Sequence, residues 1–265
     1  MSKKLTITVL GCGNSSGVPA IGNHWGDCDP SEPKNRRTRS SIAVQSKNTT
    51  LIIDTGPDFR TQLNREDIGH IDAVLYTHSH SDHTDGINDL RIFRFRSQKL
   101  VPIYGNKETL SDLHRRFDFL FEGGKIQLYP PILESHEFGK AHFEKPKTIG
   151  DITFTPFIQD HGSIETVGYR FGDCAYSLDM HDLNARAVET LRGIKTWIVD
   201  AAAYNQENNA VHANLKTIYR LNEKIGASEV ILSSLSLHMD YKILLNELPE
   251  GFKPAYDGLK LKCRY

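Results

Sequence analysis

Short runs of hydrophobic and polar residues follow one another through the first half of the chain. Four of these runs are rich in β-formers and are bounded by Gly, Pro, Asn or Asp, which predicts strands over 5–10, 40–46, 50–54 and 71–77. Three other segments carry helical signals. They are a run of helix formers after a proline and two stretches with hydrophobic residues at helical spacing: 57–67, 85–97 and 107–121.

The second half has the same texture. Its β-rich runs predict strands over 151–157, 166–172, 174–179, 196–201 and 229–235. Helices are predicted over 183–193 and 212–226, and the second ends at Gly226 in a C-cap position. There is no fixed-period repeat and no low-complexity linker. The pattern therefore favours one domain, residues 1–265, in two β-then-α halves with sheets inside and helices outside.

Composition narrows the class of protein. Hydrophobic residues make up 38% of the 265 positions and charged residues 25%, as in an ordinary globular protein. The net charge of −1 disfavours broad wrapping of nucleic acid, although a local basic patch stays open. The sequence shows neither the apolar core of a signal peptide nor 18 consecutive apolar residues, so we expect no membrane association. Four scattered cysteines without a C-x-x-C pair favour reduced thiols and a cytoplasmic location.

The densest chemistry lies in "YTHSHSDHTDG", which follows an apolar run. It places His78, His80, Asp82 and His83 within six positions. Imidazole and carboxylate groups suit zinc and related divalent ions. In extended backbone His78 and His80 point the same way and can meet one ion, while Asp82 and His83 can meet a second. A catalytic metal, a structural metal and a plain polar loop are the three interpretations.

The same stretch resembles the signature of the metallo-β-lactamase-fold hydrolases. This resemblance implies an α/β fold, a four-layer αβ/βα sandwich, and commonly two divalent ions. Three other pieces fall in the family's order. "LIIDTG" (51–56) implies that Asp54 holds the metal loop, "QDHG" (159–162) supplies His161 as a ligand, and "YSLD" (176–179) supplies Asp179 as a bridging ligand. Read alone, Asp54 is a turn residue and Asp179 a helix cap.

A closer subgroup is indicated by "GCGNSSGVPAIG" (11–22), "NRRTRSS" (35–41) and the C-terminal tail. These pieces resemble the branch that contains the cyclic-phosphate phosphodiesterase associated with carbon–phosphorus lyase. The tRNA 3′-processing endonucleases are more distant relatives. Their long tRNA-clamping arm has no Gly/Pro-rich basic counterpart in this sequence.

The sequence departs from that branch in two places. The branch often has a Cys cluster for a structural zinc, but here only His24 and Cys28 remain, too few for a closed four-ligand site. The branch also carries its last metal histidine where this chain has Ser234 and Ser236. The nearby His238 is therefore predicted to take that role, with a one-metal or asymmetric site as the alternative.

Two further features have two interpretations each. His212 begins a predicted helix and can be a plain N-terminal residue, but related phosphodiesterases place a non-ligand histidine at a matching position, which implies a general acid. The basic run "KNRRTRSS" (34–41) is typical of a solvated turn, and its arginines also match the geometry of phosphate oxygens.

The resulting prediction is a metal-dependent hydrolase, most simply a phosphodiesterase for a small, cyclic or open phosphodiester. A hydroxide bridging two Zn²⁺ or Mn²⁺ ions, or Fe²⁺, would attack phosphorus. Asp82 and His212 are the predicted catalytic residues. The predicted metal ligands are His78, His80, Asp82, His83, His161, Asp179 and His238. Hydrolysis of a thioester or lactam, and a metal-binding scaffold without catalysis, are the alternatives. Nucleic acid is not favoured as a partner, and a homodimer stays open.

Overall fold

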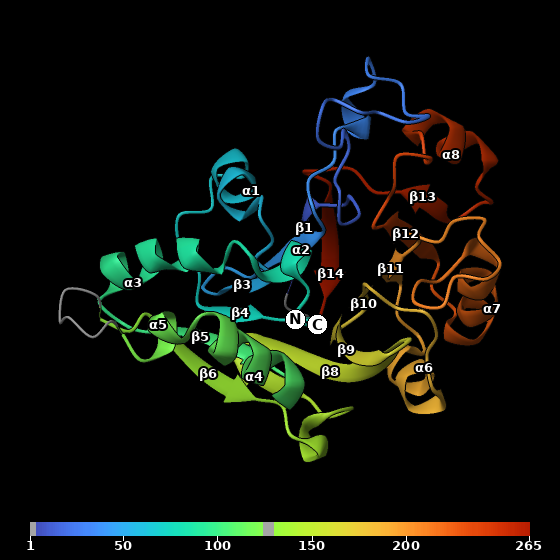
Figure 1. The fold of residues 1–265 in the computed structure, drawn as a ribbon. Helices are drawn as coiled ribbons and strands as arrows, with labels where there is room; N and C mark the ends of the chain where they lie inside the picture. The colour runs from blue at the N-terminus through green and yellow to red at the C-terminus, as the bar shows by residue number, and fades with distance from the viewer. Residues whose placement is uncertain (1–3, 124–129) are drawn as a thin grey trace.

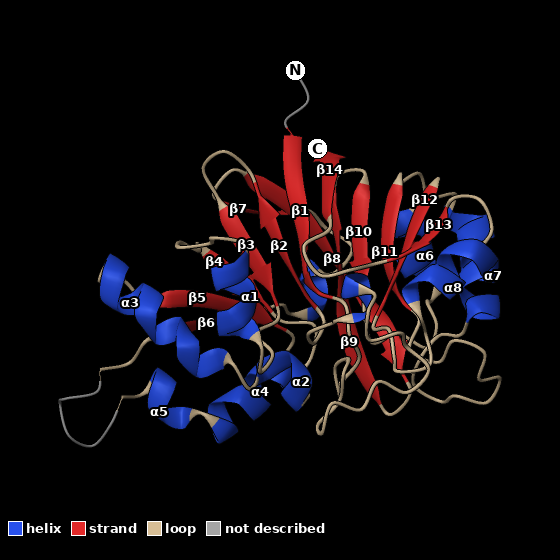
Figure 2. Ribbon diagram, turned by 90° about the horizontal axis from the view of Figure 1, so that it is seen from above, coloured by secondary structure: helices blue, strands red, loops and turns tan. Residues whose placement is uncertain are grey.

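The computed structural model describes residues 4–123 and 130–265. Its centre is a pair of seven-stranded sheets, with helices on the outer face of each (Figures 1 and 2). The predicted α/β sandwich of four layers is confirmed. Each half of the chain contributes most of one sheet and its helices, as the repeated texture of the sequence predicts.

The first sheet has the strand order β14-β1-β2-β3-β4-β5-β6. Its strands are β1 (Lys4–Gly11), β2 (Ser41–Gln45), β3 (Thr50–Ile53), β4 (Ala73–Leu75), β5 (Val101–Gly105), β6 (Leu133–Glu137) and β14 (Lys260–Arg264). Pairing is antiparallel from β14 to β3 and parallel from β3 to β6. The strand β14 closes the edge beside β1 and so brings the described C-terminal residues back to the beginning of the chain.

The second sheet has the order β13-β12-β11-β10-β9-β8-β7. Its strands are β7 (Lys147–Ile149), β8 (Ile152–His161), β9 (Ile164–Phe171), β10 (Cys174–Ser177), β11 (Thr196–Asp200), β12 (Glu229–Ser233) and β13 (Phe252–Pro254). Pairing is antiparallel from β7 to β10 and parallel from β10 to β13. Both sheets therefore contain parallel strands, whose C-terminal ends commonly border a ligand site.

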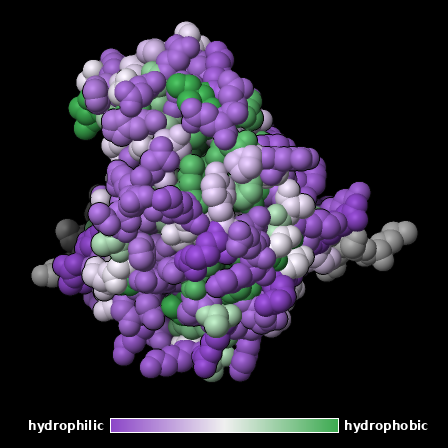
Figure 3. Space-filling view, turned by 90° about the vertical axis from the view of Figure 1, so that its right-hand side faces the viewer, coloured by the Kyte–Doolittle hydropathy of each residue, from purple (hydrophilic) through white to green (hydrophobic). Residues whose placement is uncertain are grey.

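Helices of the first half cover one outer face and helices of the second half cover the other (Figure 2). The first group is α1 (Phe59–Arg65), α2 (Ser81–Thr84), α3 (Arg91–Ser97), α4 (Lys107–Arg116) and α5 (Asp118–Phe121). The second group is α6 (Ala185–Leu191), α7 (Leu215–Ile225) and α8 (Tyr241–Glu247). Seen from the side of α6, α7 and α8, the surface is mainly hydrophilic, with scattered hydrophobic residues (Figure 3). Among the described residues, no helix has the length and apolar character needed to cross a bilayer.

Alternation along the strands explains why the layers stack in this order. In β3, Ile53 packs in the core between the two sheets, while its neighbour Ile52 packs in the core under the first group of helices. In β11, Ile198 faces the core between the sheets and Trp197 faces the core under the second group. Both faces of each central strand are thus buried, which is why these strands are continuously hydrophobic.

Several predicted boundaries need correction. The helix predicted over 212–226 begins at Leu215, because the side chain of Asn214 accepts a hydrogen bond from the backbone N–H of Thr217 and caps it. Its predicted end is confirmed, with Gly226 in the left-handed region at φ 79°. The helix predicted over 107–121 is broken at Phe117, where φ is −130°. The segment 85–97 begins as a 3₁₀-helix, Ile87–Leu90, before α3.

Candidate metal centre

The C-terminal ends of five strands converge on one region. Asp54 follows β3, His78 lies beyond β4, and Asp179 lies beyond β10. Asp200 ends β11, and Ser234 follows β12. Three of these, Asp54, Asp179 and Ser234, adopt positive φ angles of 66°, 48° and 59°. Left-handed backbone at non-glycine residues is uncommon and clusters at functional sites. These three turns therefore indicate a candidate functional site in this region.

The four predicted residues of the histidine-rich loop lie together with two residues from the second half of the chain. One group of candidate ligand atoms, all within 4.8 Å of one another, comes from His78, His80, His161 and Asp179. A second such group comes from Asp82, His83 and Asp179. The structure therefore brings together six of the seven residues predicted as metal ligands.

Asp179 belongs to both groups, and its carboxylate also lies in a third such group with Asp200 and His212. Its Oδ2 lies 3.2 Å from His78 Nε2, 3.1 Å from His83 Nε2 and 3.9 Å from His161 Nε2. Burial raises the pKa of Asp179, but the neighbouring imidazoles of His83 and His78 lower it more, so its pKa lies well below the ordinary value. The helix-cap interpretation fails, because the side chain of Asn184 caps α6.

Backbone and side-chain partners fix the orientation of the imidazoles. Asp54 is fully buried, and its carboxylate accepts hydrogen bonds from the backbone N–H and the hydroxyl of Thr77 and contacts His83 Nδ1 at 2.8 Å. His161 Nδ1 donates to the carbonyl of Val211 at 2.6 Å. In both rings Nε2 is left to face the cluster, an arrangement typical of metal-binding histidines. Asp54 thus holds the loop, as the family resemblance implies.

The chemistry of this donor set fits a divalent metal. His78 is buried, and its Nε2 has no hydrogen-bond partner among the described residues. Burial and the charge of His83 lower the pKa of His78 to about 4, so its ring is neutral at neutral pH. A buried polar atom without a partner is destabilising in a protein interior. A divalent cation bound between this neutral imidazole nitrogen and the neighbouring carboxylate would satisfy both groups.

The structure does not bring His238 to this cluster. Its side chain is 69% exposed, and its Nδ1 lies 2.7 Å from Asp27 Oδ2. Ser234 instead lines the cavity that contains the cluster. The sequence-based choice of His238 followed from its being the nearest imidazole along the chain, but the turn after β12 directs residue 234, not residue 238, toward the centre of the site.

The sequence leaves too few ligands for a structural zinc near the N-terminus, and the described residues do not gather a site there. Cys28 Sγ lies 3.4 Å from the carbonyl oxygen of Leu237, and His24 is exposed. Cys12 lies elsewhere, against the carboxylate of Asp257. These residues do not form a group of three candidate ligands in the described part of the chain.

His212 faces the same centre from the second half of the chain. Its Nδ1 lies 2.7 Å from Oδ2 of Asp200, and its ring centroid is 5.1 Å from that of His161. Burial lowers the pKa of His212, but the carboxylate of Asp200 raises it more, to about 9. Sequence reasoning missed Asp200. Its place at the end of a hydrophobic strand, like that of Asp54 and Asp179, was the available signal.

A polar cavity of about 300 Å³ opens over this centre. Residues of the cluster line it together with neutral polar side chains from four loops. The lining residues are Asn14, Ser15, His80, Asp82, His161, Ser163, Asp179, Ala202, Gln206, Asn209, Val211, His212 and Ser234. None of these described lining residues is Lys or Arg.

The basic run at 34–41 has structural partners. Arg37 is buried, and its guanidinium donates to the carbonyl of Ser236 and to the side chain of Asn35. Arg39 pairs with Asp58 at 3.0 Å. The ammonium group of Lys34 lies over the ring of Tyr241. These contacts join the N-terminal loop to neighbouring segments, and none of these three residues lines the cavity over the cluster.

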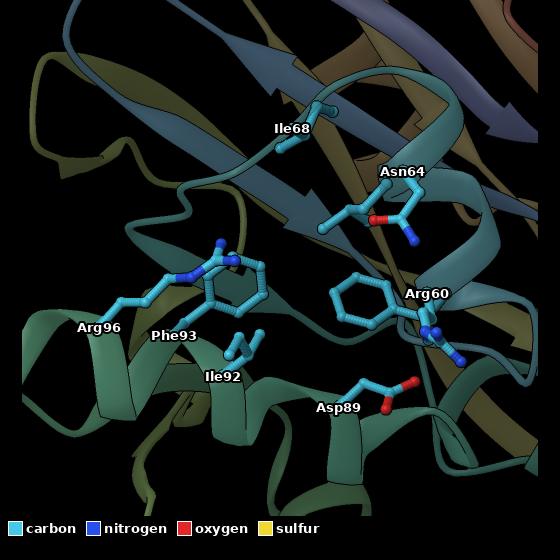
Figure 4. Close-up of a pocket in the computed structure, with 9 residues that line it drawn as sticks. Arg60, Asn64, Ile68, Asp89, Ile92, Phe93 and Arg96 are labelled. Atoms are coloured by element: carbon cyan, nitrogen blue, oxygen red, sulfur yellow. The ribbon is translucent and has the colours of Figure 1, made fainter.

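A second cavity, of about 350 Å³, lies between α1 and α3 (Figure 4). Its walls include Phe93 and Ile92 from α3 and Ile68, with Arg60 and Arg96 at its edges. It contains none of the predicted site residues. The geometry therefore places the chemistry at the strand ends, away from this groove.

Comparison with known proteins agrees with the geometry. A family model described as "Beta-lactamase superfamily domain" matches residues 49–233. The crystal structure of a new diphosphatase from the PhnP family is 34% identical to this chain, with a TM-score of 0.88, and the match covers 100% of this chain and 99% of that one.

Two curated proteins are also similar. An octanoyltransferase from Porphyromonas gingivalis is 30% identical over 256 residues, which is 95% of this chain and 50% of that protein. A ribonuclease Z from Bradyrhizobium diazoefficiens is 26% identical over 145 residues, covering 53% of this chain and 46% of that protein. The chain thus spans about half the length of the curated relatives it matches.

Proposed function

The chain belongs to the metallo-β-lactamase superfamily, and on that premise we propose that it is a metal-dependent phosphodiesterase for a small phosphodiester. The observation that carries the proposal is the place of His212. Held by Asp200, it lines the same cavity as four members of the cluster, His80, Asp82, His161 and Asp179. A proton donor and a candidate metal centre on one cavity wall are the parts that phosphodiester hydrolysis needs.

The cluster would hold up to two divalent ions through His78, His80, Asp82, His83, His161 and Asp179. When bound, such ions lower the pKa of a coordinated water to about 7 and withdraw charge from phosphoryl oxygens. Asp54 and the carbonyl of Val211 keep His83 and His161 in the tautomer and orientation that a metal requires. Asp82 contributes a carboxylate at the cavity wall.

His212 would donate a proton to the leaving oxygen. Its Nδ1 is engaged by Asp200, so Nε2 is the atom that remains for the substrate. The pKa of about 9 keeps the ring protonated at neutral pH. A protonated imidazole can both give up its proton to a departing alkoxide and stabilise the charge that develops there.

The cavity's lining supports a diester with a single negative charge. A terminal phosphate or a diphosphate carries more charge and is usually held by Arg or Lys, and neither lines the described cavity walls. The amides of Asn14 and Gln206 instead suit the hydroxyls of a sugar-like group. We therefore propose a small polar diester, cyclic or open, rather than a diphosphate.

The similarity to an octanoyltransferase raises acyl-ester or thioester chemistry as a second candidate. Among the described lining residues, only Ala202 and Val211 are aliphatic. An octanoyl chain would need a larger apolar surface, since ligand pockets match the polarity of the groups they bury. The cavity therefore favours the phosphodiester.

A panel of substrates separates these candidates. The metal-loaded protein is assayed on bis-p-nitrophenyl phosphate, p-nitrophenyl phosphate, a cyclic ribose phosphate, a nucleoside diphosphate and an octanoyl thioester. The proposal predicts hydrolysis of the diesters and little of the monoester, the diphosphate or the thioester. Preference for the diphosphate or the thioester contradicts it, and inertness on all five favours a scaffold.

A further inference from the structure

The two groups of candidate ligand atoms are unequal in number. Four residues form the first group and three form the second, and Asp179 belongs to both. Without Asp179, the first keeps three imidazoles and the second keeps His83 and Asp82. Since ligand number and charge set the affinity for a divalent ion, the two positions cannot be equivalent.

Ser234 is the residue that the end of β12 brings to the cavity shared with the smaller group. It lies in the turn after β12, is only 4% exposed, and lines the same cavity as Asp82 and Asp179. Its φ of 59° repeats the left-handed backbone of Asp54 and Asp179 at the other strand ends. Ser234 and Asp179 thus both lie in left-handed turns after parallel strands, and both reach the same cavity.

A serine at this position supplies little to a metal. Its hydroxyl is neutral, whereas imidazole and carboxylate groups are the side chains that hold zinc and related ions. The imidazole nearest along the chain does not replace it, because His238 is exposed and paired with Asp27. Among the described residues, no other histidine, cysteine or carboxylate joins Asp82, His83 and Asp179 within one 4.8 Å group.

We infer that the two positions bind divalent ions with unequal affinity and that Ser234 sets the difference. The first ion binds at His78, His80, His161 and Asp179. The second binds more weakly at Asp82, His83 and Asp179, beside the Ser234 hydroxyl. The inference rests on the metal site of the proposed function and deepens it. The first position would stay occupied, while the occupancy of the second position would follow the free metal concentration.

The test measures metal binding and needs no substrate. Apoprotein prepared with a chelator is titrated with Zn²⁺ and separately with Mn²⁺ against a chromophoric competitor, and bound metal is counted by atomic emission. We expect one equivalent per chain to bind first and the second to need at least about 10-fold more free metal. Ser234→His and Ser234→Asp should each tighten the second equivalent by about 10- to 100-fold.

The choice of variants keeps the test sound. His and Asp are among the non-glycine residues that tolerate left-handed backbone, so both fit the φ of Ser234. Ser236→His is the matched control, two positions further and outside the cavity lining, and should leave both affinities unchanged. Asp82→Asn should weaken only the second equivalent, and His80→Ala chiefly the first. Circular dichroism and a thermal melt confirm that each variant is folded.

The outcomes are distinct. Two equivalents of equal affinity in the native protein overturn the inference and leave the proposed hydrolysis standing. Folded Ser234→His and Ser234→Asp variants without a tighter second equivalent also overturn it. An absence of bound metal overturns both the inference and the proposed function.

Discussion

His212 Nδ1 lies 2.7 Å from Asp200 Oδ2, so a carboxylate that ends β11 holds an imidazole on the wall of the cavity. The two residues are 12 positions apart in sequence, and β11 and the loop before α7 bring them together. Asp200 also accepts a hydrogen bond from the backbone N–H of Met180, the residue after Asp179. One buried carboxylate thereby links the proposed proton donor to the turn that carries the shared ligand.

Replacing His212 should remove the proton donor and leave the metal centre intact. We expect His212→Asn to lower kcat by about 10²- to 10⁴-fold, the usual contribution of a general acid, with metal content unchanged. His181→Asn is the matched control, because the half-buried His181 pairs with Asp160 outside the cavity. Equal kcat values for the two variants would remove His212 from the mechanism.

Asp200→Asn should shift the pH profile. The carboxylate raises the pKa of His212, so its removal lowers that pKa. A general acid is active while protonated, and the alkaline limb of the kcat profile should therefore move to lower pH. The check is kcat on bis-p-nitrophenyl phosphate across the neutral to alkaline range. An unchanged or upward-shifted alkaline limb contradicts the assigned pairing.

Replacing Asp54 should lower both the stability of the fold and the affinity for metal. Its carboxylate is fully buried and serves Thr77 and His83, so Asp54→Ala leaves buried donors without partners. We expect a loss of about 3–5 kcal/mol in the free energy of unfolding of the apoprotein, measured in urea. Metal affinity should fall about 10- to 100-fold as well.

The matched control for Asp54 is Asp58→Asn. Asp58 pairs with Arg39, and both side chains keep 22–28% of their surface exposed. The loss of such a pair should cost about 1 kcal/mol or less. Equal destabilisation by the two substitutions would show that Asp54 has no special role beneath the metal loop.

Within the basic run at 34–41, we expect the buried Arg37 to stabilise the fold and not to bind phosphate. Arg37→Met removes donors to Ser236 and Asn35 in the interior and should cost about 2–3 kcal/mol of unfolding free energy. Arg36→Met changes an exposed neighbour and should stay within about 0.5 kcal/mol. The measurement is the free energy of unfolding of both variants in urea. A native-like Arg37→Met with a raised KM would instead restore the phosphate-gripping interpretation.

Metal loading should stabilise the folded chain. An ion that binds only the native state at 100 times its Kd adds about 2.7 kcal/mol to the free energy of unfolding. We expect Zn²⁺ or Mn²⁺ to raise the melting temperature and His78→Ala to reduce that rise, because His78 offers a buried free nitrogen. A melting temperature that is insensitive to both metal and chelator would speak against the centre.

Much of the site was accessible from the sequence because its ligands lie near one another or beside hydrophobic strands. His78, His80, Asp82 and His83 form a local motif, and β-rich runs predicted strands just before His161 and up to Asp179. A local motif and a β-rich run can both be recognised from neighbouring residues of the chain. The motif order then gave the four-layer sandwich through resemblance.

The remainder depended on long-range geometry. The strands β5 and β6 were not predicted, since Pro102 interrupts one and "LESHE" in the other is largely polar. His238 looked like a ligand by proximity in sequence, but the left-handed turn at Ser234 carries the backbone past the site four residues earlier. Asp200 was missed because its one sequence signal was its place at the end of a hydrophobic strand, with no motif around it.

The most direct test of the central claim is the metal dependence of diester hydrolysis. The kcat/KM of the native chain for bis-p-nitrophenyl phosphate is measured as purified, after exhaustive chelation and dialysis, and after Zn²⁺ or Mn²⁺ is restored. Turnover should disappear with the metal and return with it. Turnover that survives complete chelation, or a metal-loaded chain that hydrolyses no phosphodiester, would contradict the claim.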